Sequence, residues 1–166
     1  MPLQTSFSYG LGILPKGSLA TCEMNNSYTG YTGVVLPFGV AVVTAAGITG
    51  QQPRVVTPSA AIVRIDGITG RLFANEGDAA ILTPDGYAAN NLVRVYNKGV
   101  IIVYSETAVN PTLPVFVRYA ANGALTQLGD FRATADGAFA SELTTGARWR
   151  SSTTAAGLAE LSINYA

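Results

Sequence analysis

Carboxylates are the residues of this chain with the clearest capacity for catalysis, because the sequence contains no histidine. The absence of imidazole excludes Ser-His-Asp and Cys-His nucleophile activation and the usual zinc sites. A glycosidase-like pair of acids could in principle be drawn from Glu76, Asp78, Asp85 and Glu106. Acidic residues followed by glycine, as in Asp85-Gly86, are more typical of turns. We therefore expect no catalytic residues and no enzymatic activity.

Cofactor and metal motifs are also missing from the sequence. Neither the phosphate-binding loop that ends in Gly-Lys-Ser/Thr nor the dinucleotide-binding glycine pattern occurs. The Glu76-Gly77-Asp78 segment offers a local pair of carboxylates, whereas calcium takes about six to eight oxygen ligands. Cys22 is the single cysteine, which excludes an intramolecular disulfide and indicates a buried or partly buried thiol in a reducing compartment. We expect no cofactor and no metal.

Composition favours a protein that works in contact with other subunits. The 166 residues suffice for about one domain with its own core. Only 12% are charged and the net charge is zero, so the sequence favours neither nucleic acid nor an anionic membrane as a partner.

No apolar run approaches the roughly 20 residues that span a bilayer, and residues 1–5 lack the features of a secretory signal. Synthesis in a cytoplasm is therefore expected.

Short apolar runs separated by turn sequences predict an all-β fold. Residues 92–119 hold several such runs, and Asn97-Lys98-Gly99 is typical of a hairpin loop between the first two. Residues 100–104 are apolar throughout, so this run should lie in the middle of a sandwich or have one face covered by another subunit. Residues 159–164 alternate apolar and polar side chains, as in a half-exposed strand. We predict a single-domain antiparallel β-sandwich or barrel of about eight to eleven strands, with a jelly roll as the natural topology.

The N-terminal segment differs from the rest in composition. Residues 1–20 mix aromatic and aliphatic side chains with Ser and Gly and show neither a helical period nor a clean strand. An extended arm that gains order on a partner fits this pattern, and so does an edge strand of the domain. We divide the chain into an arm, residues 1–20, and a β domain, residues 21–166. The apolar residues of the arm expected to contact a partner are Phe7, Tyr9, Leu11, Ile13 and Leu14.

A series of short motifs follows in order along the second half of the chain. They are Gly86-Tyr87; Val93-Arg94-Val95 with Lys98-Gly99-Val100-Ile101; Ala108-Val109 with Pro114-Val115-Phe116-Val117-Arg118; Asp130-Phe131-Arg132; Gly146-Ala147-Arg148-Trp149; and Gly157-Leu158-Ala159-Glu160-Leu161. In this order they resemble the structural cement, or head decoration, proteins of tailed bacteriophages, and residues 37–43 are similar to that family's early strand. The chain departs from the family's usual pattern in two places. Residues 110–113 lack the Gly-Asp that is common there in the family, and the region around residues 45–60 is longer than expected for the family.

The resemblance implies a protein that binds the outer surface of the mature, expanded phage head. It would form a homodimer or homotrimer, bridge neighbouring subunits of the major capsid protein, and be made in the host bacterial cytoplasm before it joins the virion. Candidates for contact between subunits or with capsid acids are Arg118, Arg132, Arg148 and Arg150. The alternative for these arginines is an intramolecular ion pair near a strand end. Trp149 is expected in the core, with a binding platform as its alternative.

A carbohydrate- or receptor-binding β-module, such as a head-fibre or tail-associated domain, is the alternative function. Exposed aromatic residues in loops would favour it, and Tyr28, Tyr31 and Tyr87 are the candidates. Binding to a glycan array would separate such a module from a decoration protein.

Overall fold

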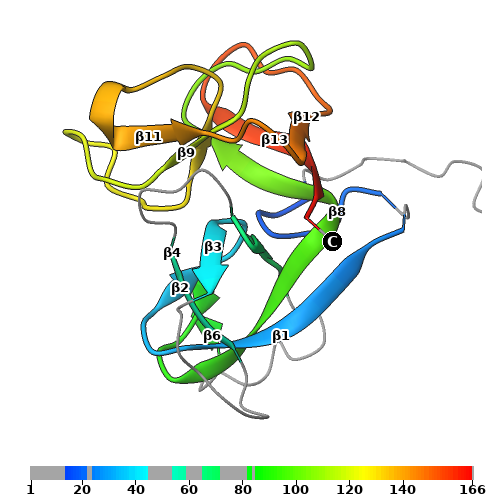
Figure 1. The fold of residues 1–166 in the computed structure, drawn as a ribbon, viewed down its shortest axis with the longest axis vertical. Helices are drawn as coiled ribbons and strands as arrows, with labels where there is room; N and C mark the ends of the chain where they lie inside the picture. The colour runs from blue at the N-terminus through cyan, green and yellow to red at the C-terminus, as the bar shows by residue number, and fades with distance from the viewer. Residues whose placement is uncertain are drawn as a thin grey trace, which may run out of the picture.

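The computed structural model describes residues 14–21, 24–44, 54–58, 65–71, 82–83 and 85–165. Apart from one short 3-10 helix, η1 (Gly137–Phe139), the elements of these residues are β-strands (Figure 1). In chain order they are β1 (Asn26–Thr32), β2 (Leu36–Pro37), β3 (Ala41–Thr44), β4 (Arg54–Pro58), β5 (Gly67–Thr69), β6 (Leu82–Thr83), β7 (Gly86–Tyr87), β8 (Asn91–Ser105), β9 (Phe116–Arg118), β10 (Phe131–Arg132), β11 (Ala140–Glu142), β12 (Ala147–Trp149) and β13 (Gly157–Asn164). The predicted all-β sandwich or barrel class is confirmed, while the jelly-roll topology stays a prediction.

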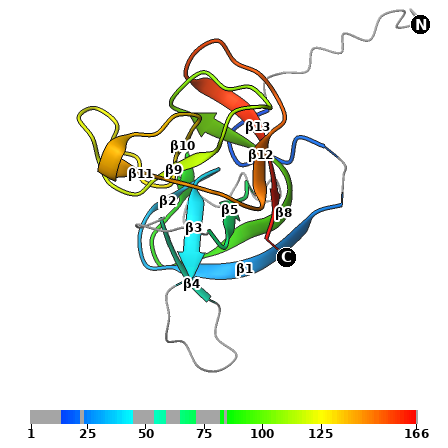
Figure 2. The same cartoon turned by 45° about the horizontal axis from the view of Figure 1, so that its top comes forward.

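Strand β8 is the element that joins the two parts of the molecule. Figure 1 shows it running from the part that holds β1 and β3 to the part that holds β9 and β13. Its first half pairs with β1 and β5, and its second half pairs with β13. In Figure 2, β9, β10 and β11 gather at the end of the molecule away from β1 and β4.

The hairpin loop predicted at Asn97-Lys98-Gly99 is wrong, because β8 continues through these residues as a single strand. Lys98 is the residue where one partner strand gives way to the next, since it faces both Asn26 of β1 and Asn164 of β13. Gly99 has a φ of 138°, a value that favours glycine. The turn sequence therefore marks the place where the pairing partner changes within a continuous strand.

Among the described residues, two apolar clusters form the core, and β8 contributes to both. Val93 and Val95 from its first half pack in a cluster with Leu36, Phe38, Val40, Val42 and Tyr87. Ile101 and Val103 from its second half pack in a larger cluster that includes Val117, Phe131, Trp149, Leu161 and Ile163. Residues 100–103 are all buried within the single chain, so their apolar character needs no second subunit to explain it. Each such side chain contributes about 1.5–3 kcal/mol by its burial.

Most strand pairs are antiparallel, as predicted, but β1 pairs with β4 and β8 with β10 in parallel. The alternation predicted for the last strand is confirmed in β13. Its apolar positions Ala159, Leu161 and Ile163 are buried against the core. Its intervening polar positions are half-buried or exposed. Strands β2, β7 and β6 form a separate small sheet.

The last residues of the segment expected to be an arm lie beside β8. Leu19 forms a bridge with Ile101, and the amide of Gly17 donates a 2.8 Å hydrogen bond to the carbonyl of Ile102. The preceding residues 1–13 lie outside the described part of the chain. Among the residues that the structure describes, no helix is long and apolar enough to cross a membrane.

Candidate interaction surfaces

Two of the candidate arginines, Arg118 and Arg132, lie inside the molecule. Arg118 ends β9 and is fully buried, and Arg132 on the neighbouring strand β10 is 8% exposed. Arg118 binds Glu106 through two hydrogen bonds, from Nε to Oε1 and from Nη2 to Oε2. Its Nη2 also donates to Asp136 Oδ2 at 2.6 Å, and Arg132 Nη1 donates to the same oxygen at 2.6 Å. We refer to Arg118, Arg132, Glu106 and Asp136 as the ion cluster.

The charges of the ion cluster balance, which is the condition under which charged groups tolerate burial. Hydrogen bonding to Glu106 raises the pKa of Arg118, against the opposing effect of burial, and Asp136 raises it further. The hydrogen bond from Arg118 is also the main cause that lowers the pKa of Asp136. The cluster ties the end of β8 to β9, β10 and the segment before η1. For Arg118 and Arg132, the structure therefore shows the intramolecular ion pairs that the sequence left open as the alternative.

The other two candidate arginines, Arg148 and Arg150, are exposed and flank Trp149 at β12. Trp149 itself is fully buried, and its Nε1 donates a 3.0 Å hydrogen bond to the carbonyl of Pro114. The expectation that this tryptophan belongs to the core is confirmed. Because side chains alternate between the two faces of a strand, the buried Trp149 lies between two exposed arginines, Arg148 and Arg150.

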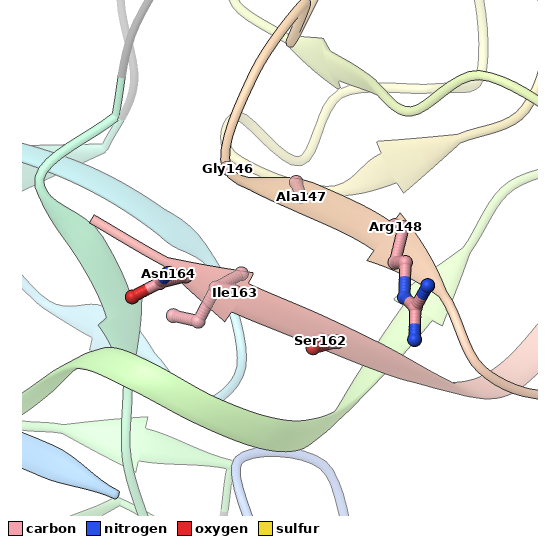
Figure 3. Close-up of a pocket in the computed structure, with 6 residues that line it drawn as sticks. All are labelled: Gly146, Ala147, Arg148, Ser162, Ile163 and Asn164. Carbon is pink, nitrogen blue, oxygen red and sulfur yellow. The ribbon is translucent and has the colours of Figure 1, made fainter.

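A groove of about 340 Å³ runs over the β12–β13 pair next to Arg148. It is lined by Gly146, Ala147, Arg148, Ser162, Ile163 and Asn164. Figure 3 shows Arg148 and Asn164 at opposite ends of this groove, with Ser162 on the strand between them. Arg148 and Ser162 are direct cross-strand partners. The lining offers one guanidinium, one amide and one hydroxyl, which is suited to hydrogen bonding with another protein and lacks an acid–base pair.

The remaining candidates of the expected arm can be placed only in part. Leu14 is 37% exposed at the start of the described chain. Phe7, Tyr9, Leu11 and Ile13 lie outside the described residues. Glu76, Asp78 and Cys22 also lie outside them. Within the described ranges, no group of three or more His, Cys, Asp or Glu side chains is arranged to hold a metal ion.

The family model described as structural cement protein (E217 gp24/Pam3 gp6) matches residues 3–164. This chain belongs to the phage structural cement protein family. The family resemblance of the sequence motifs is confirmed, and it extends over nearly the whole chain. Membership places this cement protein among the structural, capsid-associated components of the phage particle.

Two solved structures share the fold of this cement protein. One comes from the capsid of Myoviridae phage XM1, with a TM-score of 0.65 and 19% identity, covering 91% of this chain and 90% of the other. The second is the N base of head fiber gp8.5 in bacteriophage phi29, with a TM-score of 0.50 and 11% identity, covering 86% of this chain and 97% of the other. At these identities the likeness concerns the fold alone. The comparison with curated proteins found no match.

The aromatic residues that could have marked a sugar-binding loop in this cement protein lie on strands instead. Tyr28 and Tyr31 belong to β1 and are half-buried, and Tyr31 donates a 3.0 Å hydrogen bond to Asn90. Tyr87 on β7 is fully buried, and its hydroxyl donates to the carbonyl of Gly70 at 2.6 Å. Burial raises the pKa of Tyr87 to about 12, so this donor stays protonated at ordinary pH. None of these three aromatic residues is therefore the exposed loop residue that would have favoured a carbohydrate- or receptor-binding module.

Proposed function

We propose that this protein is a non-enzymatic decoration protein that binds the outer surface of the mature phage head and bridges neighbouring major capsid subunits. The observation that carries the proposal is the match of the cement family to residues 3–164. The low charged fraction of 12% and the zero net charge agree with a surface that is largely covered by other protein subunits. The protein forms a homodimer or homotrimer in this proposal. It is made in the host bacterial cytoplasm and then joins the shell from outside.

Avidity explains how such a protein holds a shell together without strong individual contacts. Each oligomer engages the lattice at several equivalent places, so modest affinities per contact combine. The apolar N-terminal residues supply one kind of contact in this proposal, because an extended arm can add a strand to an exposed sheet edge. Arg148 and Arg150 supply another, since exposed guanidinium groups bind carboxylates through paired hydrogen bonds.

Co-sedimentation of the purified protein with undecorated capsids, before and after expansion, tests the proposal. We expect saturable binding to expanded shells and none to unexpanded ones. A folded protein that binds neither form contradicts it. In that case a glycan array tests the alternative, a carbohydrate- or receptor-binding module, for which the shared fold with the phi29 head fiber base is the supporting observation.

Substitutions in the full-length chain separate the two kinds of contact. Replacing Phe7, Leu11 and Ile13 together by Ser should weaken capsid binding strongly if the arm contacts the shell. The changes stay within residues 1–13, because residues 17–20 hydrogen-bond with β8 and support the fold. Val35→Ser is the matched control, since Val35 is an apolar side chain that is 57% exposed elsewhere. Equal binding by the triple variant and the control would remove the arm from the proposal.

A further inference from the structure

A second cleft, of about 360 Å³, lies where six separate segments of the chain meet. Pro15 and Pro37 form apolar walls of the cleft, together with Tyr104, which is 36% exposed. Lys16, Arg71 and Asp85 contribute charged groups. This volume is at the lower end of the range for ligand sites, about 300–1,000 Å³, and suits one side chain with its flanking residues.

Arg71 is the distinctive residue of this cleft, because its guanidinium has no carboxylate partner among the described residues. Its Cζ lies 5.1 Å from the centroid of the Phe38 ring, within the range of a cation–π contact. The Phe38 ring is in turn fixed by an edge-on contact with Tyr87, with ring centroids 5.1 Å apart. Arg71 therefore differs from the arginines of the ion cluster, which are saturated by acids.

Lys16 does not compete for the same role, since Asp130 already neutralises it. Its Nζ lies 2.6 Å from Asp130 Oδ1 and 5.9 Å from the centroid of the Tyr104 ring. Among the described residues that line the cleft, the remaining charges are the guanidinium of Arg71 and the exposed carboxylate of Asp85. One cation that has no carboxylate partner in the described part of the chain, beside one acid, favours a single negative charge and disfavours a dianionic phosphate or a nucleic acid backbone.

Backbone contacts make the cleft rigid. Gly17 and Gly39 have φ values of 83° and 65°, and a Cβ on Gly39 would lie 2.9 Å from the backbone nitrogen of Gly17. The amide of Arg71 donates to the carbonyl of Gly17, and the amide of Phe38 donates to the carbonyl of Asp85. This close approach of glycines brings the segments that line the cleft together before any ligand arrives, which lowers the entropic cost of binding.

We propose that this cleft binds one Asp or Glu side chain of a partner protein, with the carboxylate on Arg71 and the adjoining apolar residues on Pro15, Pro37 and Tyr104. The identity of the partner, the major capsid protein, rests on the proposed function. The binding of a carboxylate-bearing peptide by the cleft does not depend on it.

The direct test is a titration of the isotopically labelled full-length protein with a short peptide, acetyl-Gly-Leu-Glu-Leu-Gly-amide, followed by NMR. We expect shifts at Arg71 Nε and at the Gly17 and Gly39 amides, with a Kd of about 1–10 mM, because one charge-assisted pair supplies most of the free energy. The same peptide with Gln in place of Glu should shift them much less. Arg71→Met should abolish the response, while Arg94→Met, at an exposed arginine on β8, should leave it intact.

Equal responses to the Glu and Gln peptides, or an unchanged response in Arg71→Met, would overturn the proposal. A stronger response of the cleft amides to inorganic phosphate or to a panel of free sugars would also overturn it, in favour of another ligand class.

In co-sedimentation, Arg71→Met should weaken binding to expanded shells at least about tenfold, and Arg71→Lys should weaken it less. If wild-type protein binds shells and Arg71→Met binds equally well, the cleft fails as a capsid site while the decoration function stands. If wild-type protein binds no shell, the decoration function fails and the peptide titration still decides the chemistry of the cleft.

Discussion

Replacing Arg118 by Met is the perturbation whose effect follows most directly from the structure. The fully buried guanidinium holds Glu106 through two hydrogen bonds and also donates to Asp136 and to the carbonyl of Ala120. After the substitution, the Glu106 carboxylate, whose side chain is 2% exposed, would retain from the cluster only Arg132 Nη1 at 3.3 Å. Removing one partner of a buried ion pair typically costs about 3–5 kcal/mol. We expect a loss of that size in the free energy of unfolding.

A double-mutant cycle distinguishes the lost charge balance from lost packing. Glu106→Met alone leaves an excess positive charge and should also destabilise the fold. Arg118→Met combined with Glu106→Met removes one charge of each sign and leaves Arg132 paired with Asp136 at 2.6 Å. The double variant should therefore be more stable than the sum of the single effects predicts, by about 2–3 kcal/mol. Arg148→Met, at an exposed arginine, is the matched control and should change stability by at most about 0.5 kcal/mol.

Urea unfolding at fixed protein concentration, followed by the fluorescence of Trp149, is the assay. Trp149 is the single tryptophan and is fully buried, so its emission reports the opening of the larger core. An unchanged slope of free energy against urea would show that stability, and not the unfolded state, has changed. A loss below about 1 kcal/mol for Arg118→Met, or strictly additive effects in the cycle, would refute the description of the cluster as a balanced buried network.

Three further predictions address other parts of the fold. Tyr87→Phe removes a hydroxyl that serves two backbone groups, so urea unfolding should show a loss of about 1–3 kcal/mol; a neutral effect would contradict its role as a buried donor. Gly39→Ala should cost at least about 2–3 kcal/mol through its φ of 65° and its crowded Cβ position, and Gly123→Ala, with a φ of 58° and open space, only about 1 kcal/mol; equal losses would argue against close packing at Gly39. Since hydrogen bonding to Arg118 lowers the pKa of Asp136, the stability from this carboxylate is fully present above about pH 4 and is lost as the pH falls through its lowered pKa. Urea midpoints measured from pH 6 to pH 2.5 should therefore fall more steeply for wild type than for Asp136→Asn, and parallel profiles would contradict this assignment.

Local patterns in the sequence predicted the strands that are buried on one or both faces. The alternation at residues 159–164 and the apolar run at residues 100–103 follow from burial, and both were predicted correctly, whereas Tyr104 at the end of that run is 36% exposed. The hairpin expected at Asn97-Lys98-Gly99 failed because a local turn signal was outweighed by pairing with strands distant in sequence on either side. Propensity for a turn is a weak preference compared with a continuous ladder of hydrogen bonds.

The candidate surfaces were less predictable, because they depend on which distant residues meet. Arg118 lies 12 residues from Glu106 along the chain and 18 from Asp136, and nothing local in the sequence selects these partners. The exposure of Arg148 and Arg150 follows from alternation about the core residue Trp149, which the sequence does show. The cleft at Arg71 arises where glycines far apart in the chain approach closely, a contact that only the tertiary structure reveals.

Cryo-electron microscopy of expanded, undecorated shells with and without the added protein tests the central proposal most directly. The decoration function predicts additional density on the outer surface, repeated over the lattice and touching neighbouring major capsid subunits, into which the β fold described above can be placed. Absence of lattice density, or density confined to one vertex, would contradict it.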